Sequence, residues 1–343
     1  MLRLQRPWKI VAPAILCVLS LALVSVPAFS QSETDLSRPS IGGAPTQVRL
    51  GFYLADLNEI SGGDQTLFAD VVIQAEWEDP RLAGRWDAVH NLALDAVWNP
   101  NLQLLNPRGI SPYFPQRVEV DPSGRVRWRQ RWVGRFSTRM DLRDFPLDHQ
   151  QFHIQMVSLG YGPSEVDLVA DTDYSKQSRA ANLSITDWII GPTRVELADF
   201  DPGPGSKVQS GIRLSWDGQR HVGYYAVQVI LPLVLIVLMG SGALWVSSSA
   251  IPARISISMT TMLTLISYRF SIGKSVPNLT YLTRFDYFML ASTVIIFLTF
   301  VTVVSSVYLS SNGNAEISKR VDVWARMAFP ILFTLVFILS WWG

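Results

Sequence analysis

Hydrophobic and polar positions follow two different patterns in the two parts of this 343-residue chain. Residues 31–219 are mostly polar, and short runs of alternating apolar and polar residues are separated by turn-forming Gly, Pro, Asn and Asp. The clearest runs are residues 69–77, 118–120, 126–136, 151–157, 185–195 and 208–216. Alternation with a period of two is typical of β-strands with one buried face. Short strands with frequent turns predict a β-sandwich.

From Tyr224 onward the pattern changes to four apolar stretches. They cover about residues 224–246, 252–272, 286–309 and 321–342. Each stretch is close to the ~20 residues that a helix needs to span a bilayer. The second stretch is the most polar of the four. The sequence therefore predicts a β-sandwich over residues 31–220 and a transmembrane domain of four helices over residues 221–343.

The first thirty residues have the pattern of a secretory signal peptide. Arg3, Arg6 and Lys9 precede an apolar run over residues 10–29, and Ala28-Phe29-Ser30 provides small residues for cleavage. An uncleaved membrane anchor is the alternative. The single cysteine, Cys17, lies in this segment, so we expect no disulfide in the mature protein.

Charge and motifs argue against several classes of function. The chain carries 29 Lys and Arg against 28 Asp and Glu, which gives no basic excess for nucleic-acid binding. The mature chain would lack a cysteine nucleophile, a metal-spaced His/Cys cluster and a phosphate-binding glycine motif. We therefore expect neither an enzyme nor a bound cofactor, metal or nucleic acid.

A polar stripe runs through the second apolar stretch. Ser256, Thr260, Leu263, Ser267, Ser271 and Lys274 recur at steps of 4, 3, 4, 4 and 3 residues. Such steps place side chains on one face of a helix. Hydroxyl groups buried without partners cost free energy, whereas a helix that lines a water-filled path exposes them to water. The stripe predicts a pore-lining helix. The alternative is a bundle helix whose hydroxyls bond to neighbouring helices or to their own backbone.

Three motifs in the polar part follow one another at fitting distances. They are Trp77-Glu78-Asp79-Pro80-Arg81-Leu82, then Trp98-Asn99-Pro100-Asn101 with Asn106, and then Met140-Asp141-Leu142-Arg143-Asp144-Phe145-Pro146-Leu147-Asp148. They resemble the WxDxRL strand end, the WxPD…N segment and the signature loop of the pentameric ligand-gated ion channel (Cys-loop receptor) family. Thr138 and Phe152 stand where the eukaryotic members have two cysteines. Together with the signal peptide, this resembles a prokaryotic member.

The membrane part carries the same resemblance. Its matching segments are Arg220-His221-Val222-Gly223-Tyr224-Tyr225 with Pro232, Ser275-Val276-Pro277-Asn278-Leu279-Thr280-Tyr281 with Asp286, and Val321-Asp322 with Arg326 and Pro330. The short linker at residues 310–318 leaves no room for a large cytoplasmic domain. The resemblance implies a homopentamer around a central pore, with the lipid bilayer and a permeant ion as its partners.

For the pore, the resemblance implies that Arg254, Ser256, Thr260, Leu263, Ser267, Ser271 and Lys274 line the ion path. Five copies of Leu263 would form a gate that closes by dewetting. Pro252-Ala253-Arg254 is similar to the anion-selective glycine- and glutamate-gated chloride channel branch, and no acidic residue occurs from Ser241 to Val276. We therefore expect chloride selectivity. The alternatives are that Arg254 only reaches lipid headgroups and that the channel is cation-selective; Arg269 faces either the pore or a neighbouring helix.

For coupling between the two domains, the resemblance brings six residues together at the membrane end of the sandwich. They are Phe145, Pro146, Asp148, Arg220, Pro277 and Tyr281. An Arg220–Asp148 pair that changes geometry between two packings would be a bistable element. The alternative is an ordinary surface ion pair with little energetic effect.

The agonist site is implied less clearly. Carried over position by position, the ligand-binding residues are Gln74, Gln103, Arg131, Leu159, Tyr161 and Phe200. Only Tyr161 and Phe200 supply the aromatic faces that bind cations. The agonist is therefore an unidentified small molecule, or protons acting through histidines such as His149 and His221.

These predictions together describe a multi-pass protein of the bacterial inner membrane with its N-terminal domain in the periplasm. The competing interpretation is a membrane-anchored periplasmic sensor or binding protein that conducts no ions.

Overall fold

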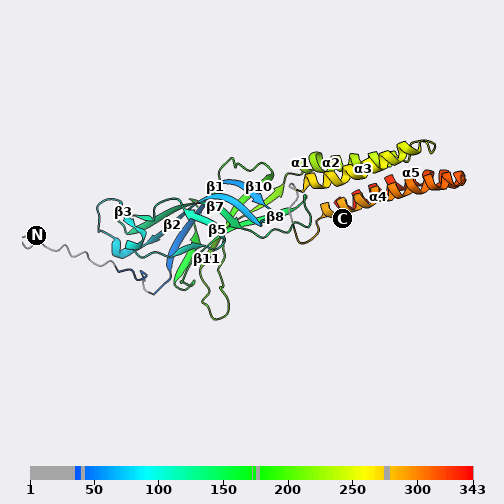
Figure 1. Ribbon diagram of the computed structural model, residues 1–343. Helices are drawn as coiled ribbons and strands as arrows, with labels where there is room; N and C mark the ends of the chain where they lie inside the picture. The colour runs from blue at the N-terminus through cyan, green and yellow to red at the C-terminus, as the bar shows by residue number, and fades with distance from the viewer. Residues whose placement is uncertain (1–34, 40–42, 172, 175–177, 274–278, 343) are drawn as a thin grey trace, which may run out of the picture. The chain divides into compact units, whose positions relative to one another are not determined.

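The computed structural model describes residues 35–39, 43–171, 173–174, 178–273 and 279–342. The predicted signal peptide, Lys274 and Pro277 lie outside the described residues. Within them, β-strands make up the N-terminal part and helices the C-terminal part (Figure 1).

The larger of two sheets has seven strands. Their order is β3 (His90–Ala93), β6 (Arg117–Val120), β7 (Arg125–Ser137), β2 (Thr66–Glu78), β1 (Thr46–Ser61) and β9 (Val166–Ala170), and β5 (Pro107–Pro112) pairs with β7. All pairs are antiparallel except β1 with β9. Short 3₁₀ turns occur at η1 (Pro80–Leu82) and η2 (Leu94–Ala96).

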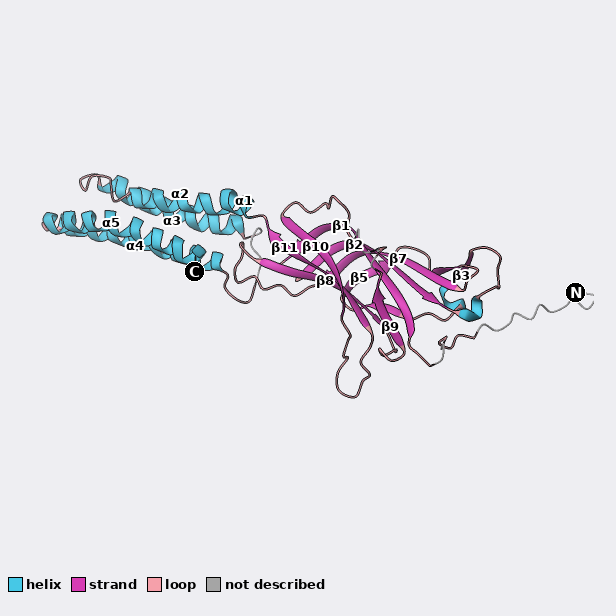
Figure 2. Ribbon diagram, turned by 180° about the vertical axis from the view of Figure 1, so that it is seen from behind, coloured by secondary structure: helices cyan, strands magenta, loops and turns pink. Residues whose placement is uncertain are grey.

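The smaller sheet has four antiparallel strands. Their order is β10 (Trp188–Leu197), β11 (Gly211–Arg220), β8 (His149–Ser158) and β4 (Leu102–Leu104) (Figure 2). The loop between β7 and β8 carries the signature motif, and the loop between β10 and β11 carries Phe200.

Alternating apolar side chains form the core of the sandwich. Every second side chain of β2 from Leu67 to Ala75 is buried, and the rings of Phe136, Phe152 and Trp216 are almost completely enclosed. Burial of one large apolar side chain stabilises a fold by about 1.5–3 kcal/mol. The six predicted strand runs overlap β2, β6, β7, β8, β10 and β11, and the predicted β-sandwich followed by helices is confirmed.

The helical part starts with α1 (Val222–Tyr225), a π-helical turn η4 (Ala226–Ile230) and α2 (Leu231–Gly242), which follow one another without a break. Then come α3 (Ile251–Ile272), α4 (Arg284–Ser311) and α5 (Ala315–Trp342). A capping box starts α4, where Thr283 and Asp286 exchange side-chain-to-backbone hydrogen bonds. Both α2 and α5 pack against α4, and α3 packs between α2 and α4.

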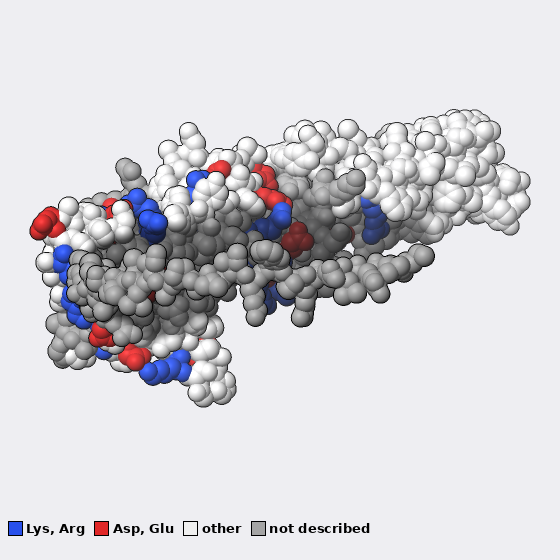
Figure 3. All heavy atoms as spheres, turned by 60° about the vertical axis from the view of Figure 1, so that its left-hand side comes forward, with Lys and Arg blue, Asp and Glu red and all other residues white. Residues whose placement is uncertain are grey.

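Among the described residues, three helical segments are long and apolar enough to cross a membrane. They are Val222–Gly242, Arg284–Ser311 and Ala315–Trp341. Hydroxyl-bearing residues and two arginines reduce the hydropathy of α3, which is not in this set. Figure 3 shows charged side chains over the sandwich and a largely uncharged surface over the helices on the face in view. The chain is therefore a membrane protein.

Candidate pore helix, coupling region and ligand-binding surfaces

The predicted polar stripe lies on the side of α3 that the other helices leave uncovered. Its described members are all exposed: Ser256, Thr260, Leu263, Ser267 and Ser271. Leu263 has 64% of its surface accessible. A large apolar side chain so exposed in the middle of a bundle helix indicates a surface that faces another copy, lipid or a pore.

Hydroxyl groups behave differently on the two sides of α3. On the covered side, Ser258 and Thr261 donate to carbonyls one turn earlier in the same helix, Arg254 O and Ile257 O. On the uncovered side, the hydroxyls of the stripe donate to no acceptor within the described part of the chain. The stripe hydroxyls therefore have no partner within the described part of the chain and stay free to contact water, ions or another copy.

Arg254 does not lie on this stripe, which corrects the prediction that it lines the pore. Its side chain is completely buried, and its Nη2 lies 2.7 Å from Asp322 Oδ1 of α5. The reason is geometric: Arg254 precedes Ser256 by two residues, and two residues turn an α-helix by about 200°. The same pairing also contradicts the alternative that Arg254 reaches lipid headgroups. Pro252 and Ala253 are exposed.

Arg269, whose orientation the sequence leaves open, is exposed. It follows Ser267 by two residues and therefore lies about 200° around the helix from the stripe.

The predicted coupling residues Asp148 and Arg220 form a buried pair, not a surface one. Arg220 Nε lies 3.0 Å from Asp148 Oδ1, and the two side chains are 5% and 1% exposed. The guanidinium also lies over the rings of Trp188 and Phe145, at 4.3 and 5.0 Å from their centroids. Gln150 Nε2 donates to the second Asp148 oxygen. The charge of Arg220 is thus enclosed by one carboxylate and by aromatic faces.

The signature loop contacts the helices directly. The Leu142 backbone N–H donates to the hydroxyl of Tyr281 at 3.0 Å, and Phe145 packs edge-on against Tyr225 of α1 and Phe285 of α4. The neighbouring Pro146 is buried.

Charged contacts missed at the sequence level reinforce this junction. Arg284 Nε lies 2.7 Å from Asp144 Oδ1, and the Arg284 N–H donates to the Arg143 carbonyl. A signal for this contact was present in the sequence. Asp144 lies in the signature loop, and the oppositely charged Arg284 follows the segment at residues 275–281 that is expected to lie near that loop.

The histidines considered for proton sensing are in different environments. His149 and His221 are exposed near the buried pair. His153 on β8 is half-buried, and burial lowers its pKa; Arg213 lowers it further, and Glu196 opposes both. This lowered pKa makes His153 a poorer candidate for sensing protons near neutral pH.

Of the predicted ligand-binding residues, Gln74 and Arg131 lie on β2 and β7 of the larger sheet. Arg131 Nε donates to Asp70 Oδ1 at 2.9 Å, and this hydrogen bond together with Coulombic attraction raises the pKa of Arg131. Gln74 accepts a hydrogen bond from Arg129 Nη2 at 2.9 Å. Arg129 is exposed and is paired with an amide instead of a carboxylate, so it presents more free positive charge than Arg131.

The other predicted ligand-binding residues belong to the smaller sheet and its loops. Gln103 and Leu159 are exposed, and Phe200 is half-buried, with backbone hydrogen bonds to Gln209 across the β10–β11 loop. Tyr161 is partly enclosed, since its hydroxyl accepts a hydrogen bond from Trp98 Nε1 at 3.1 Å. The six residues therefore form two groups on different sheets and not one pocket within a single chain.

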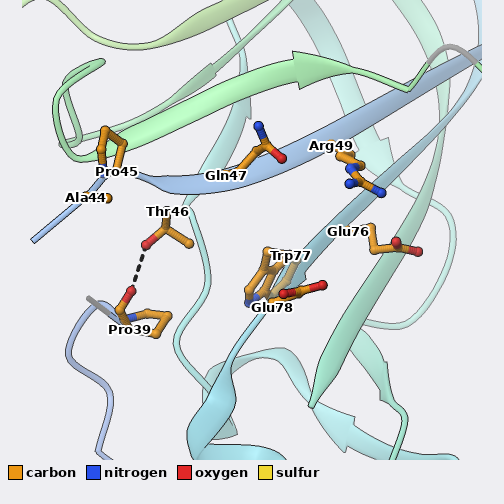
Figure 4. A pocket seen from close by; sticks show the side chains of 9 residues that line it. All are labelled: Pro39, Ala44, Pro45, Thr46, Gln47, Arg49, Glu76, Trp77 and Glu78. Atoms are coloured by element: carbon orange, nitrogen blue, oxygen red, sulfur yellow. Dashed lines mark hydrogen bonds between the residues drawn. The ribbon is translucent and has the colours of Figure 1, made fainter. Parts of the chain in front are cut away.

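A separate cavity of about 310 Å³ lies where the start of β1 pairs with the end of β2, and none of those six residues lines it. Figure 4 shows Arg49, Glu76 and Glu78 among its lining side chains, and the Thr46 hydroxyl donating to the Pro39 carbonyl. Glu76 pairs with Arg127 at 3.2 Å. The cavity is thus a polar surface feature outside the predicted site.

Comparison with known proteins agrees with this architecture. The family model described as "Neurotransmitter-gated ion-channel ligand binding domain" matches residues 31–197. The gamma-aminobutyric acid receptor subunit beta-4 of Gallus gallus is 25% identical over 271 residues, which cover 76% of this chain and 55% of the relative. The gamma-aminobutyric acid receptor subunit beta of Lymnaea stagnalis is 23% identical over 327 residues, covering 84% and 65%.

The chain belongs to the pentameric ligand-gated ion channel family. This family consists of ion channels, not enzymes, and its ligand-binding domain is of an extracellular type. The chain spans only 55% and 65% of the length of these two relatives. In this member of the family, Thr138 and Phe152 are both buried, so core packing occupies the positions where the family resemblance places two cysteines.

Proposed function

We propose that this protein is a ligand-gated anion channel. It forms a homopentamer in the inner membrane of a bacterium, with residues 31–220 in the periplasm after removal of a signal peptide over residues 1–30. Four helices in residues 221–343 cross the bilayer, and a small ligand opens a chloride path along the fivefold axis.

The uncovered stripe of α3 carries the proposal. In a ring of five subunits, Ser256 and Thr260 supply hydroxyl groups to a partly dehydrated ion, and five Leu263 side chains form an apolar constriction. A non-conducting sensor has no need of a helix that exposes hydroxyl groups and a leucine on one face in the membrane part.

Anion selectivity rests on the beginning of α3. Pro252 and Ala253 are exposed there, and the sequence from Ser241 to Val276 contains no acidic residue that would attract cations. The two relatives, named as gamma-aminobutyric acid receptor subunits, also favour the anion branch.

The agonist is proposed to bind between subunits. The two groups of predicted ligand-binding residues lie on different sheets of one chain, so neighbouring copies in a ring would bring them together. The group on the larger sheet includes Gln74 and the charge of Arg129, and the group on the smaller sheet includes Tyr161 and Phe200. Small amino acids are the first class to screen, followed by amines and protons.

Ion flux into liposomes tests the function. The purified protein is expected to dissipate a chloride gradient across the liposome membrane when an agonist is added. Leu263→Ala is expected to raise the chloride flux without agonist, because the constriction becomes wider and less apolar. Leu339→Ala is the matched control, since Leu339 is an equally exposed leucine on α5. Silence of wild type and Leu263→Ala under every ligand and pH would contradict the proposal.

Reversal potentials in a chloride gradient test the selectivity. We expect the reversal potential to follow chloride. A potential that follows sodium would leave the channel in place and overturn the anion selectivity.

A further inference from the structure

All four long helical segments meet at one buried arginine at the end of the bundle opposite the sandwich. Arg254 is the second residue after Pro252 in α3, and its guanidinium makes a bidentate contact with Asp322 of α5 at 2.9 and 2.7 Å. Its Nε donates to the Ala243 carbonyl just after α2, and its Nη1 lies 3.5 Å from the Ser306 hydroxyl of α4. The two charged side chains are 0% and 4% exposed.

The groups around this pair satisfy one another. The Ser318 hydroxyl of α5 donates to the Ser306 carbonyl, and the hydroxyls of Ser306 and Ser318 lie 2.8 Å apart. A buried charge pair is tolerated only where its remaining donors find acceptors, and here Ala243, Ser306 and Asp322 provide them.

A second arginine, Arg326 of α5, extends the connection by one turn of α5 beyond Asp322. Arg326 Nε donates to the Leu244 carbonyl at 2.8 Å, and its guanidinium lies over the ring of Trp245. The carbonyls that α2 leaves free at its end, Ala243 and Leu244, are thus bound by arginines of α3 and α5. The contacts of Arg326 therefore fix the segment between α2 and α3, which leads into the proposed pore helix.

We propose that Asp322 is a positioning residue for Arg254 and that the charge of Arg254 does not set the sign of the permeant ion. Asp322 draws the guanidinium into the bundle, cancels its charge and fixes the beginning of α3 relative to α2 and α4. The ion path then meets Pro252 and Ala253 instead of an arginine ring. This inference rests on the proposed channel function and deepens it.

A charge exchange tests the inference. In Arg254→Asp with Asp322→Arg, the signs are swapped inside the bundle. If the pair is internal, the swapped protein keeps the reversal potential of the wild type; if residue 254 faces the ion path, the new carboxylate ring shifts the potential from chloride toward sodium. A neutral double variant, Arg254→Gln with Asp322→Asn, is expected to leave the potential unshifted as well.

The single variants show whether the two residues act as a pair. Arg254→Asp alone and Asp322→Arg alone are expected to lose most of the pentamer recovered by size exclusion, because each leaves two like charges buried together. The swap or the neutral double variant is expected to restore it. The control is Glu316→Lys with Lys319→Glu, an exposed pair on the same helix at 3.2 Å, whose single and double variants should all assemble.

The outcomes separate this inference from the function it rests on. A reversal potential that moves toward sodium in the swap or in the neutral double variant overturns the inference, and so does full assembly of both single variants or failure of both double variants. A wild type that carries no current overturns the proposed function, whereas rescue of assembly is measured without current and still shows whether the pair positions α3.

Discussion

At the residue scale, two arginine–aspartate pairs are almost wholly buried in the described part of the chain, Arg220–Asp148 and Arg254–Asp322. Each joins elements that are far apart in sequence, β11 with the signature loop and α3 with α5. The cost of removing two charges from water offsets most of their attraction, so such pairs add little net stability. Their effect is positional, because either partner left alone is strongly destabilising.

Asp148→Asn tests this at the junction between sandwich and helices. The substitution leaves the Arg220 guanidinium buried without a countercharge, and we expect the free energy of unfolding to fall by about 3–5 kcal/mol. Asp217→Asn is the control: Asp217 pairs with Arg194 while both side chains are more than half exposed, and we expect a loss of about 0–1 kcal/mol. Denaturant unfolding of the full-length protein in detergent measures both. Equal losses in the two variants would show that the burial of Arg220 has no special effect.

The buried pairs also show where sequence reasoning stops at this scale. The steps of three and four residues in the sequence are enough to predict the exposed stripe of α3. The same spacing places Arg254 on the opposite side of α3. The prediction that Arg254 lines the pore came from the resemblance of Pro252-Ala253-Arg254 to a family motif and did not take its position around the helix into account. Asp322 is 68 residues further along, and no local pattern connects it with Arg254.

At the element scale, strands with regular alternation were predictable and irregular ones were not. β2 buries every second residue and was recognised, whereas β1 (Thr46–Ser61) was not. Its pairing with β2 shifts register between Leu54 and Asp56 and again between Leu57 and Glu59, which breaks the period of two. Pairing with β2 and β9 defines this strand, and its own alternation does not.

The junction between the signature loop and the helices is the element-scale feature that bears on gating. The loop docks through an aromatic cluster at Phe145 and through the hydrogen bond from Leu142 to Tyr281. Since the loop belongs to the sandwich and Tyr281 precedes α4, a movement that separates the loop from the start of α4 must strain or break this bond.

Tyr281→Phe removes the acceptor and leaves the ring. Loss of one hydrogen bond of about 0.5–1.5 kcal/mol corresponds to a change of about two- to tenfold in the gating equilibrium. We expect the agonist concentration for half-maximal flux to change by that factor, while the free energy of unfolding falls by no more than the same ~0.5–1.5 kcal/mol. Tyr287→Phe, at an exposed tyrosine of α4, should leave the dose–response curve unchanged. A curve for Tyr281→Phe that coincides with wild type would exclude this bond from coupling.

At the scale of the whole molecule, the predicted ligand-binding residues are divided between the two sheets of each chain. Gln74 and Arg129 lie on the larger sheet, and Tyr161 and Phe200 belong to the smaller sheet and its loops. If agonist binds between subunits, each interface takes one group from each of two chains. Within a closed ring of head-to-tail contacts, every subunit then supplies both groups, but to different sites.

Mixing subunits distinguishes this arrangement from a site within one chain. Phe200→Ala and Gln74→Ala are each expected to weaken agonist action in homopentamers, because each removes one half of every site. When the two variants are co-expressed, a Gln74→Ala subunit offers an intact Phe200 to the intact Gln74 of a Phe200→Ala neighbour, and that interface is wild type. The mixture should therefore regain a response at low agonist concentration that neither variant gives alone. As the control, a subunit that carries both substitutions is co-expressed with either single variant, because no interface in that mixture contains both an intact Phe200 and an intact Gln74. If the site lies within one chain, no subunit in the mixture is intact, and a mixture no more sensitive than its better component would place the agonist there.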